Sequence, residues 1–164
     1  MKALLQQWDG KSKADIEAIY QNTSAELAFV NDLILLLQQP ELQKGASWLL
    51  KTHVDNGCVL SETESQEVLA CLKHLGDWQA KLHILQIFHA IKISHEYKRE
   101  VESFVRPLIT DKNKFVRAWA YNGFYLLAKA YPEYRNEADE FIKMALRDEA
   151  ASVKARIRNM LKSS

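Results

Sequence analysis

The sequence predicts an all-α protein built from helical hairpins, and three observations support this prediction. The 164 residues include only five glycines and three prolines, too few for a fold rich in tight turns. Apolar residues recur with the spacing of a helix, for example at Leu27, Val30, Ile34 and Leu37. Basic residues also recur at a nearly constant interval along the chain. A chain of this length can bury one core as a single domain.

Local signals in the first half mark where two helices begin and end. Ser24 is expected to cap a helix over residues 24–39, because a serine hydroxyl accepts from a free amide of the first turn. Pro40 then ends that helix. The next helix covers residues 41–54, since the Asn-Gly pair at 56–57 favours the left-handed backbone that follows a helix C-terminus.

A capping box opens the following pair of helices. Ser61 and Glu64 have the spacing at which hydroxyl and carboxylate each bind the other residue's backbone amide. This predicts a helix over residues 61–75. Asp77 is then expected to cap a helix over residues 78–93.

The remaining helices are predicted from the same apolar spacing at residues 2–8, 12–21, 96–109, 113–130, 134–147 and 150–162. Short loops make consecutive helices antiparallel, which gives five hairpins. We expect one domain over residues 1–164, with a capping hairpin at 1–22 and repeats at 24–54, 61–93, 96–130 and 134–162.

The internal period is the clearest signal in the chain. Intervals of 37, 36 and 37 residues separate four basic residues early in the second helices: Lys44, Lys81, Arg117 and Lys154. The preceding turns repeat almost as regularly, at Pro40, Asp77, Asp111 and Asp148. Such spacing is typical of stacked hairpins, because each hairpin has an apolar face that only its neighbours cover.

Two of these units resemble HEAT repeats. Each has an aspartate followed six positions later by a basic residue that comes after a valine: Asp111, Val116 and Arg117, then Asp148, Val153 and Lys154. The two earlier units follow by spacing, with the basic residue four positions after the turn residue, Pro40 or Asp77. The resemblance covers residues 24–162.

The resemblance to HEAT repeats implies a curved, right-handed α-α superhelix whose second helices line a concave, protein-binding face. DNA alkylation-repeat glycosylases are similar in shape and hold damaged DNA on that face. Their Trp-Trp-Asp cluster has no counterpart here. The nearest pair is Trp78 beside Asp77, where the aspartate has a capping role.

Residues at the basic position, and four and eight positions further on, share one stripe of each second helix. Aromatic and cationic residues there predict a partner-binding surface, composed of Lys44, Trp48, Lys81, His89, Arg117, Tyr121, Tyr125, Lys154 and Arg158. Alternatively, the basic residues form a structural ladder between repeats with Asp77, Asp111 and Asp148. Trp119 and Phe124 are expected in the core.

Charge is distributed unevenly, although the formal net charge is only +1. Residues 111–164 hold eleven basic and seven acidic side chains, whereas residues 1–110 hold eleven and fourteen. A basic C-terminal end suits contacts with nucleic-acid phosphates. It equally suits the polar outer face of a capping repeat.

The sequence gives little support to an enzyme. It lacks a glycine-rich phosphate loop, HExxH, GxSxG and paired CxxC motifs. Cys58, Cys71, His74 and His83 do not form the two close-spaced pairs of a zinc site. A small enzyme using His89, or the Asp77–Trp78 pair, is the third class considered, and we expect no cofactor or metal.

Two cysteines do not make a disulfide framework, and the chain shows neither a secretory signal nor an apolar run of membrane-spanning length. These features favour the cytoplasm and no membrane partner. The sequence therefore predicts a non-catalytic HEAT-like module that binds a protein partner, with nucleic-acid binding as the alternative. It predicts neither the partner's identity nor the oligomeric state.

Overall fold

The computed structural model describes residues 1–162. These residues form ten α-helices joined by turns and short 3-10 segments, and none of them forms a strand. The all-α class is therefore confirmed, while the superhelix stays a prediction. The chain divides between Lys92 and Ile93 into two compact units. No helix in the described part is long and apolar enough to cross a membrane.

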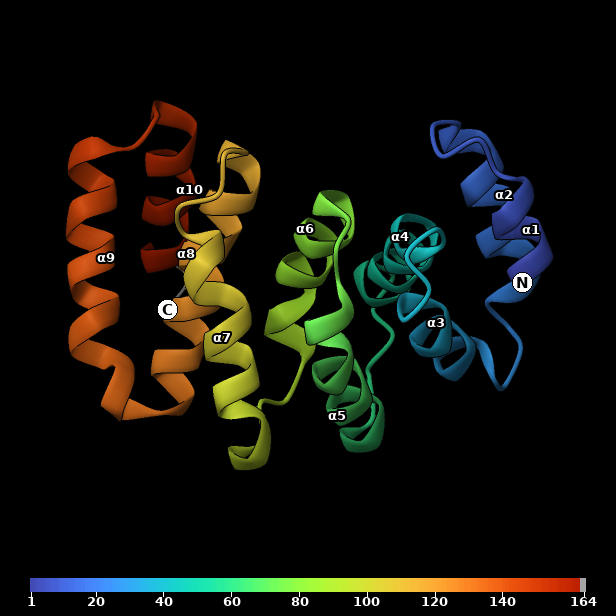
Figure 1. The fold of residues 1–164 in the computed structure, drawn as a ribbon, viewed down its shortest axis with the longest axis horizontal. Coiled ribbons are helices and arrows are strands. Elements are labelled where there is room, and N and C mark those ends of the chain that lie inside the picture. The colour runs from blue at the N-terminus through green and yellow to red at the C-terminus, as the bar shows by residue number, and fades with distance from the viewer. Residues whose placement is uncertain (163–164) are drawn as a thin grey trace. The chain divides into compact units, whose positions relative to one another are not determined.

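The N-terminal unit contains six α-helices (Figure 1): α1 (Lys2–Gln7), α2 (Lys13–Thr23), α3 (Phe29–Leu37), α4 (Gln43–Asp55), α5 (Glu62–Cys71) and α6 (Trp78–Ile87). The predicted capping box of Ser61 and Glu64 is present at the start of α5, and Asp77 caps α6. Gly57 follows α4 with φ +87°, as the sequence predicts. Short 3-10 segments, Leu72–His74 and Phe88–Ala90, follow α5 and α6.

The predicted start of the helix after residue 23 is wrong. Ser24 ends α2, because its amide donates to the carbonyl of Tyr20, and α3 begins only at Phe29. Leu27 lies in the intervening turn and is fully exposed, although the apolar pattern placed it on a buried face. The reason is that α2 continues to Thr23, which is 3% exposed and whose hydroxyl donates to the carbonyl of Ile19.

In the N-terminal unit, α4 contacts α3 and α6, and α3 contacts α5. The interior is filled by Leu33, Leu37, Leu49, Leu50, Ile84 and Leu85. Gly45 permits α1 to approach α4, since a Cβ at this position would lie 2.7 Å from Cδ2 of Leu5. The absence of a side chain at Gly45 therefore allows the two helices to lie close together.

A buried glutamine holds the turn before α6. Gln43 is 1% exposed, and its Nε2 donates to the carbonyl of His74 at 2.6 Å. Its Oε1 accepts from the amides of Gly76, at 2.9 Å, and Asp77, at 3.1 Å. One side chain therefore satisfies three backbone groups of the neighbouring hairpin.

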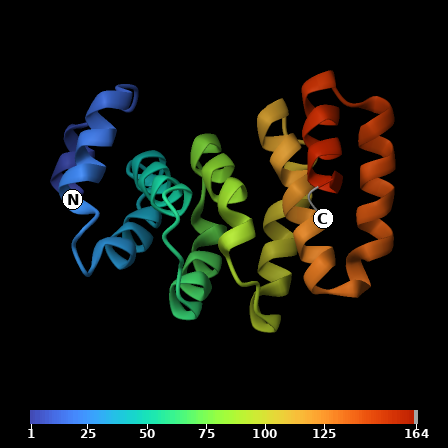
Figure 2. The ribbon, with the colours of Figure 1, turned by 180° about the vertical axis from the view of Figure 1, so that it is seen from behind.

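The C-terminal unit contains four α-helices: α7 (Lys98–Leu108), α8 (Lys114–Ala130), α9 (Arg135–Asp148) and α10 (Ala151–Lys162). Two 3-10 segments, His95–Tyr97 and Pro132–Tyr134, precede α7 and α9. The central helix is α8, which contacts α7, α9 and α10 (Figures 1 and 2). Any site built on α8 is thus supported from several sides.

Charged contacts join α7 to α9. Arg106 binds Glu102 on its own helix and Glu137 on α9, and the hydroxyl of Tyr134 donates to Glu102. The hydrogen bond to Glu137 raises the pKa of Arg106. Its guanidinium also lies 5.4 Å from the ring centre of Phe124. This guanidinium therefore serves the fold and is not free for a partner.

The two aromatic residues expected in the core, Trp119 and Phe124, differ in their exposure to solvent. Phe124 is buried as predicted, with its ring 5.0 Å from that of Phe141 in an edge-on arrangement. Trp119 is only half-buried, so that expectation is wrong. The reason is its position on α8, because it lies off the fully buried stripe that contains Val116, Ala120, Phe124 and Leu127.

Candidate binding surfaces

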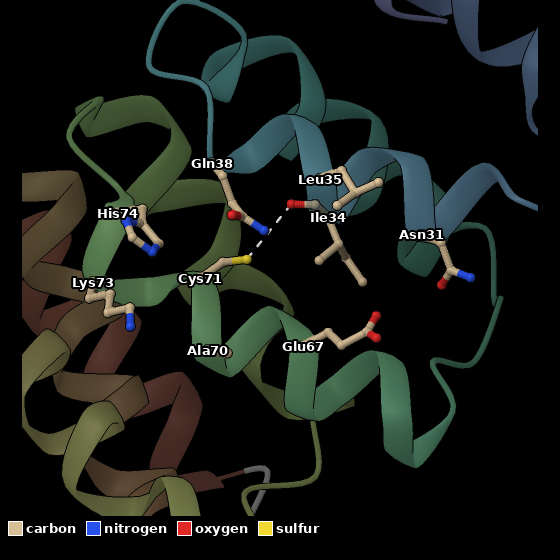
Figure 3. Close-up of a pocket in the computed structure, with 9 residues that line it drawn as sticks. All are labelled: Asn31, Ile34, Leu35, Gln38, Glu67, Ala70, Cys71, Lys73 and His74. Atoms are coloured by element: carbon tan, nitrogen blue, oxygen red, sulfur yellow. Dashed lines mark hydrogen bonds between the residues drawn. The ribbon is translucent and has the colours of Figure 1, made fainter.

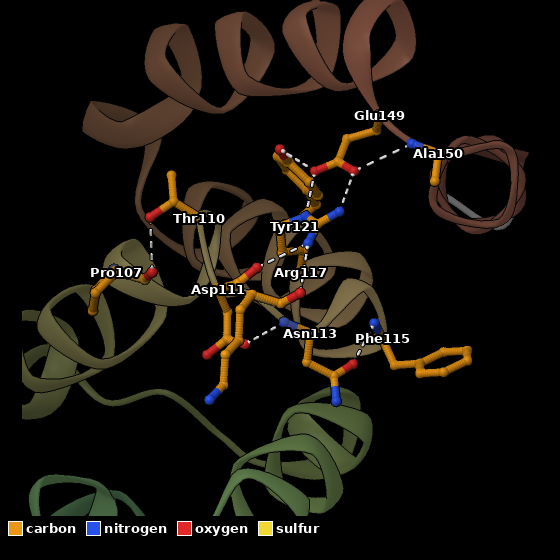
Figure 4. A network of polar contacts seen from close by, with 10 residues as sticks. Pro107, Thr110, Asp111, Asn113, Phe115, Arg117, Tyr121, Glu149 and Ala150 are labelled. Atoms are coloured by element: carbon orange, nitrogen blue, oxygen red, sulfur yellow. Dashed lines mark hydrogen bonds and ion pairs between the residues drawn. The ribbon is translucent and has the colours of Figure 1, made fainter.

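Two residues of the predicted binding stripe instead hold helices together (Figure 4). The Nε and Nη2 atoms of Arg117 donate to the two carboxylate oxygens of Glu149 at 2.7 and 2.9 Å, and Nη1 donates to the carbonyl of Asp111 at 2.9 Å. The hydroxyl of Tyr121 donates to Glu149 at 3.4 Å. This network joins α8 to Glu149, which lies just before α10.

The network also shifts the pKa values of Glu149 and Tyr121. Hydrogen bonding to Arg117 lowers the pKa of the Glu149 carboxyl. Burial, followed by the charge of Glu149, raises the pKa of Tyr121 to about 12. Tyr121 is only 7% exposed, so its predicted role as an aromatic anchor is wrong. The cause is the wide buried surface of α8, which packs against three helices.

The predicted aspartate ladder is also wrong. Asp77 and Asp111 accept from backbone amides three and two positions later, and Asp148 binds its neighbour Arg147. Within residues 1–162 none of the three pairs with a basic residue of another hairpin. Short acidic side chains in turns satisfy the turn's own backbone. The longer Glu149 reaches across to Arg117 instead.

The predicted partner-binding residues of the N-terminal unit have different environments. Lys44 lies over Trp8, with Nζ 5.7 Å from the ring centre. Trp48 and Lys81 are half-buried, and His89 is exposed with Nδ1 3.0 Å from the carbonyl of Gln86.

In the C-terminal unit, Lys154 donates to the carbonyl of Arg147 at 2.8 Å, and Arg158 is exposed. Tyr125 is half-buried at the edge of a cavity of about 340 Å³ between α8 and α9. That cavity is lined by Tyr125, Ala128, Lys129, Arg135, Ala138 and Asp139. The predicted surface thus comprises residues of both units, and only some of them face solvent.

A second set of residues follows the same period and was missed by the sequence analysis. Intervals of 36, 36 and 37 residues separate Ser47, His83, Trp119 and Arg156, which lie two or three positions beyond the basic residues. In the N-terminal unit, Ser47 Oγ lies 2.9 Å from His83 Nδ1. In the C-terminal unit, the Arg156 guanidinium carbon lies 3.6 Å from the ring centre of Trp119. These four residues share the period of the basic residues, and that period is the signal in the sequence that identifies them.

The Ser47–His83 contact is a structural pair. Ser47 is 0% exposed, and its hydroxyl also donates to the carbonyl of Lys44 at 3.1 Å. Burial lowers the pKa of His83 to about 4, and the charge of Lys51 acts in the same direction. A neutral imidazole that binds an enclosed hydroxyl stabilises the α4–α6 contact.

Four residues of the C-terminal unit form what we call the aromatic–cation platform: Lys114, Phe115, Trp119 and Arg156. Phe115 and Trp119 are four residues apart on α8 and so share a face. Each aromatic ring has a cation above it, with Lys114 Nζ 5.4 Å from the ring centre of Phe115. Phe115 is 55% exposed and extends away from the Arg117–Glu149 network (Figure 4).

Within the described chain, the cations of α10 form no ion pair with a carboxylate. Within residues 1–162, no carboxylate pairs with Lys154, Arg156, Arg158 or Lys162. Lys154 binds a backbone carbonyl. The Nε atom of Arg156 is buried and has no hydrogen-bond partner among residues 1–162. Burial lowers the pKa of this guanidinium.

A third surface feature lies in the N-terminal unit, between α3 and α5 (Figure 3). It is a cavity of about 410 Å³. The residues that line it are Asn31, Ile34, Leu35, Gln38, Glu67, Ala70, Cys71, Lys73 and His74. Cys71 is 3% exposed, its thiol donates to the carbonyl of Ile34 at 3.7 Å, and burial raises its pKa. A thiol in this state is a poor nucleophile.

The described residues contain no group of three or more His, Cys, Asp or Glu side chains placed to hold a metal ion. Comparison of the chain with protein-family models, curated proteins and solved structures finds no match.

Proposed function

We propose that this protein is a non-catalytic interaction module of the cytoplasm that binds a protein partner through its C-terminal unit. The aromatic–cation platform is the observation that carries this proposal. Its apolar ring at Phe115 is open to solvent, and neither of its cations is neutralised by a carboxylate of the described chain. Trp and Arg are the residues that most often dominate the binding energy of protein interfaces.

The platform suits a protein better than a nucleic acid. Arg156 covers Trp119 at 3.6 Å, so this indole face is occupied and a base has to displace the guanidinium to stack there. Only two cations belong to the platform, and the whole chain has a formal net charge of +1. Affinity for nucleic acid depends on the number of phosphates neutralised, and the platform itself offers only Lys114 and Arg156 for such contacts.

The chemistry of the buried groups agrees with a binding role. Burial clearly shifts the pKa values of three residues whose types suit catalysis: His53, His83 and Cys71. The ring of His53 lies 3.3 Å from the hydroxyl of Tyr20, His83 binds the enclosed Ser47, and Cys71 donates to a backbone carbonyl. All three side chains therefore have structural partners.

A selection of random peptides against the immobilised full chain tests the proposal. Enriched peptides are then titrated by fluorescence anisotropy, together with a labelled DNA duplex and a single strand at about 50 and 200 mM salt. We expect peptide binding that weakens about tenfold in Phe115→Ala, which corresponds to about 1.4 kcal/mol. Leu35→Ala, which removes an exposed leucine from the N-terminal unit, is the matched control and leaves binding unchanged.

Two outcomes contradict the proposal. One is a selection that enriches no peptide dependent on Phe115. The other is oligonucleotide binding that is tighter than any peptide and falls steeply with salt, since this result assigns the platform to nucleic acid.

A further inference from the structure

Arg156 is held in place more firmly than a surface arginine normally is. Its helix packs directly on α8, and its neighbours Val153 and Ile157 are each 1% exposed. The guanidinium lies 3.6 Å from the ring centre of Trp119, which is a close cation–π contact. Much of the side-chain entropy that binding normally costs has therefore already been lost on folding.

Within residues 1–162, the Nε atom of the same guanidinium has no hydrogen-bond acceptor. Its Nε is buried without a partner, and no ion pair or hydrogen bond within residues 1–162 involves the side chain. A buried donor without an acceptor is costly, and such a group in a folded protein requires an explanation. Because Arg156 is half-buried and not enclosed, an anion can approach it from solvent.

The surrounding charges favour an anion as well. The segment 150–162 contains four basic residues and no acidic one. The nearest carboxylate before α10, that of Glu149, already makes two hydrogen bonds with Arg117. Lys114 supplies a second cation on the platform, and Phe115 supplies an apolar surface beside it.

We propose that Arg156, seated on Trp119, is the anchoring site for a carboxylate of an acidic segment in the partner, with an apolar residue of that segment packed on Phe115. This inference rests on the proposed protein-binding function and specifies its ligand. A planar guanidinium matches a carboxylate through two parallel hydrogen bonds. Its desolvated position over the indole strengthens those bonds relative to an exposed arginine.

The test uses the full chain and a labelled peptide of glutamates and leucines, with a counterpart in which glutamine replaces each glutamate. Three variants are compared by fluorescence anisotropy: Arg156→Gln, Arg156→Lys and Arg158→Gln. The last is the matched control, because it removes one charge from an exposed position of the same helix. We expect about a tenfold loss of affinity in Arg156→Gln, equal to about 1.4 kcal/mol, and less than about a threefold loss in Arg158→Gln.

The lysine variant separates charge from shape. Lysine keeps the charge but lacks the planar fork, so we expect Arg156→Lys to restore less than half of the binding free energy lost in Arg156→Gln. The Trp119 indole N–H resonance gives an independent readout in the unmodified protein. It should shift on addition of the glutamate peptide and stay in place with the glutamine peptide.

Several results overturn the inference. They are equal binding of the two peptides, equal losses in Arg156→Gln and Arg158→Gln, an unmoved Trp119 resonance, or displacement of the peptide by a single-stranded oligonucleotide that binds more tightly. If selected peptides bind through Phe115 but contain no acidic residue and ignore Arg156→Gln, this inference fails while the proposed function stands. If no peptide of any composition binds, both fail.

Discussion

Arg117 and Glu149 form a two-point ion pair that joins α8 to the turn before α10, with Nε–Oε1 at 2.7 Å and Nη2–Oε2 at 2.9 Å. Their side chains are 22% and 12% exposed. The same glutamate accepts from Tyr121. The pair therefore fixes the position of α10, and with it the position of Arg156 over Trp119.

Removal of this carboxylate should destabilise the C-terminal unit. In Glu149→Gln the bidentate contact is lost and the Arg117 charge stays partly buried, so we expect the free energy of unfolding to fall by about 1–3 kcal/mol. Asp148→Asn is the control, because the Arg147–Asp148 pair is mostly exposed. We expect that change to stay within about 0.5 kcal/mol. Urea denaturation measures both, and equal losses in the two variants contradict this role of Glu149.

The sequence predicted the helical class well because its signals are local. The capping box at Ser61, the Asn-Gly stop at 56–57 and the capping aspartate at 77 act through the backbone of adjacent residues. The predicted start of α3 was wrong for the opposite reason, because it depends on tertiary packing. Ser24 is a good cap in isolation, but burial of Thr23 extends α2 past the position where a new helix was expected.

The exposure of the candidate surface residues was predicted less well, because it depends on which side of each helix is covered. The repeat of Arg117 and Lys154 falls on α8 and α10, yet that side of α8 is occupied by Glu149. The open side carries Phe115 and Trp119. Periodicity alone does not distinguish two stripes of one helix that share the same period, since their exposure is set by neighbouring helices.

Gln43 offers a test of the contact between hairpins in the N-terminal unit. Gln43→Leu removes a donor and an acceptor that serve three backbone groups of residues 74–77, so we expect a loss of about 2–4 kcal/mol. Gln43→Glu keeps the acceptor for the amides of Gly76 and Asp77 but loses the donor to His74. The decrease in the free energy of unfolding should therefore differ between Gln43→Glu and Gln43→Leu. In the wild-type protein, hydrogen exchange should show that the Gly76 amide is protected. Fast exchange of that amide in the folded wild type contradicts the assignment.

The close approach of α1 to α4 depends on Gly45, which has no side chain. In Gly45→Val the added atoms meet Leu5, whose Cδ2 is 2.7 Å from the Cβ position, and the Trp8 ring at 3.4 Å. We expect about 1–3 kcal/mol of destabilisation and displacement of α1, seen as a changed Trp8 environment. Gly45→Ala should show a smaller effect, because the flexible end of Leu5 can move. A valine variant with unchanged stability and an unchanged Trp8 signal shows that α1 does not pack here in solution.

The Ser47–His83 pair predicts a specific dependence of stability on pH. Burial, reinforced by Lys51 and Lys44 and opposed by Asp77 and Asp55, lowers the pKa of His83 from 6.5 to about 4. Between these values the unfolded chain binds a proton that the folded protein does not. The free energy of unfolding therefore falls as the pH is lowered from about 6.5 to about 4, by at most about 1.4 kcal/mol per pH unit, and this contribution levels off below.

His83→Gln removes this proton uptake, so its stability should fall less than that of wild type over the same pH range. His53 also has a pKa lowered by burial, and it adds a similar slope to both proteins. The quantity to measure is therefore the difference between the two urea-denaturation curves at each pH. That difference should shrink as the solution is acidified, because the neutral imidazole loses its advantage over glutamine. A constant difference between pH 7 and about pH 4.5 shows that His83 takes up its proton equally in the folded and unfolded states, which contradicts its burial against Ser47.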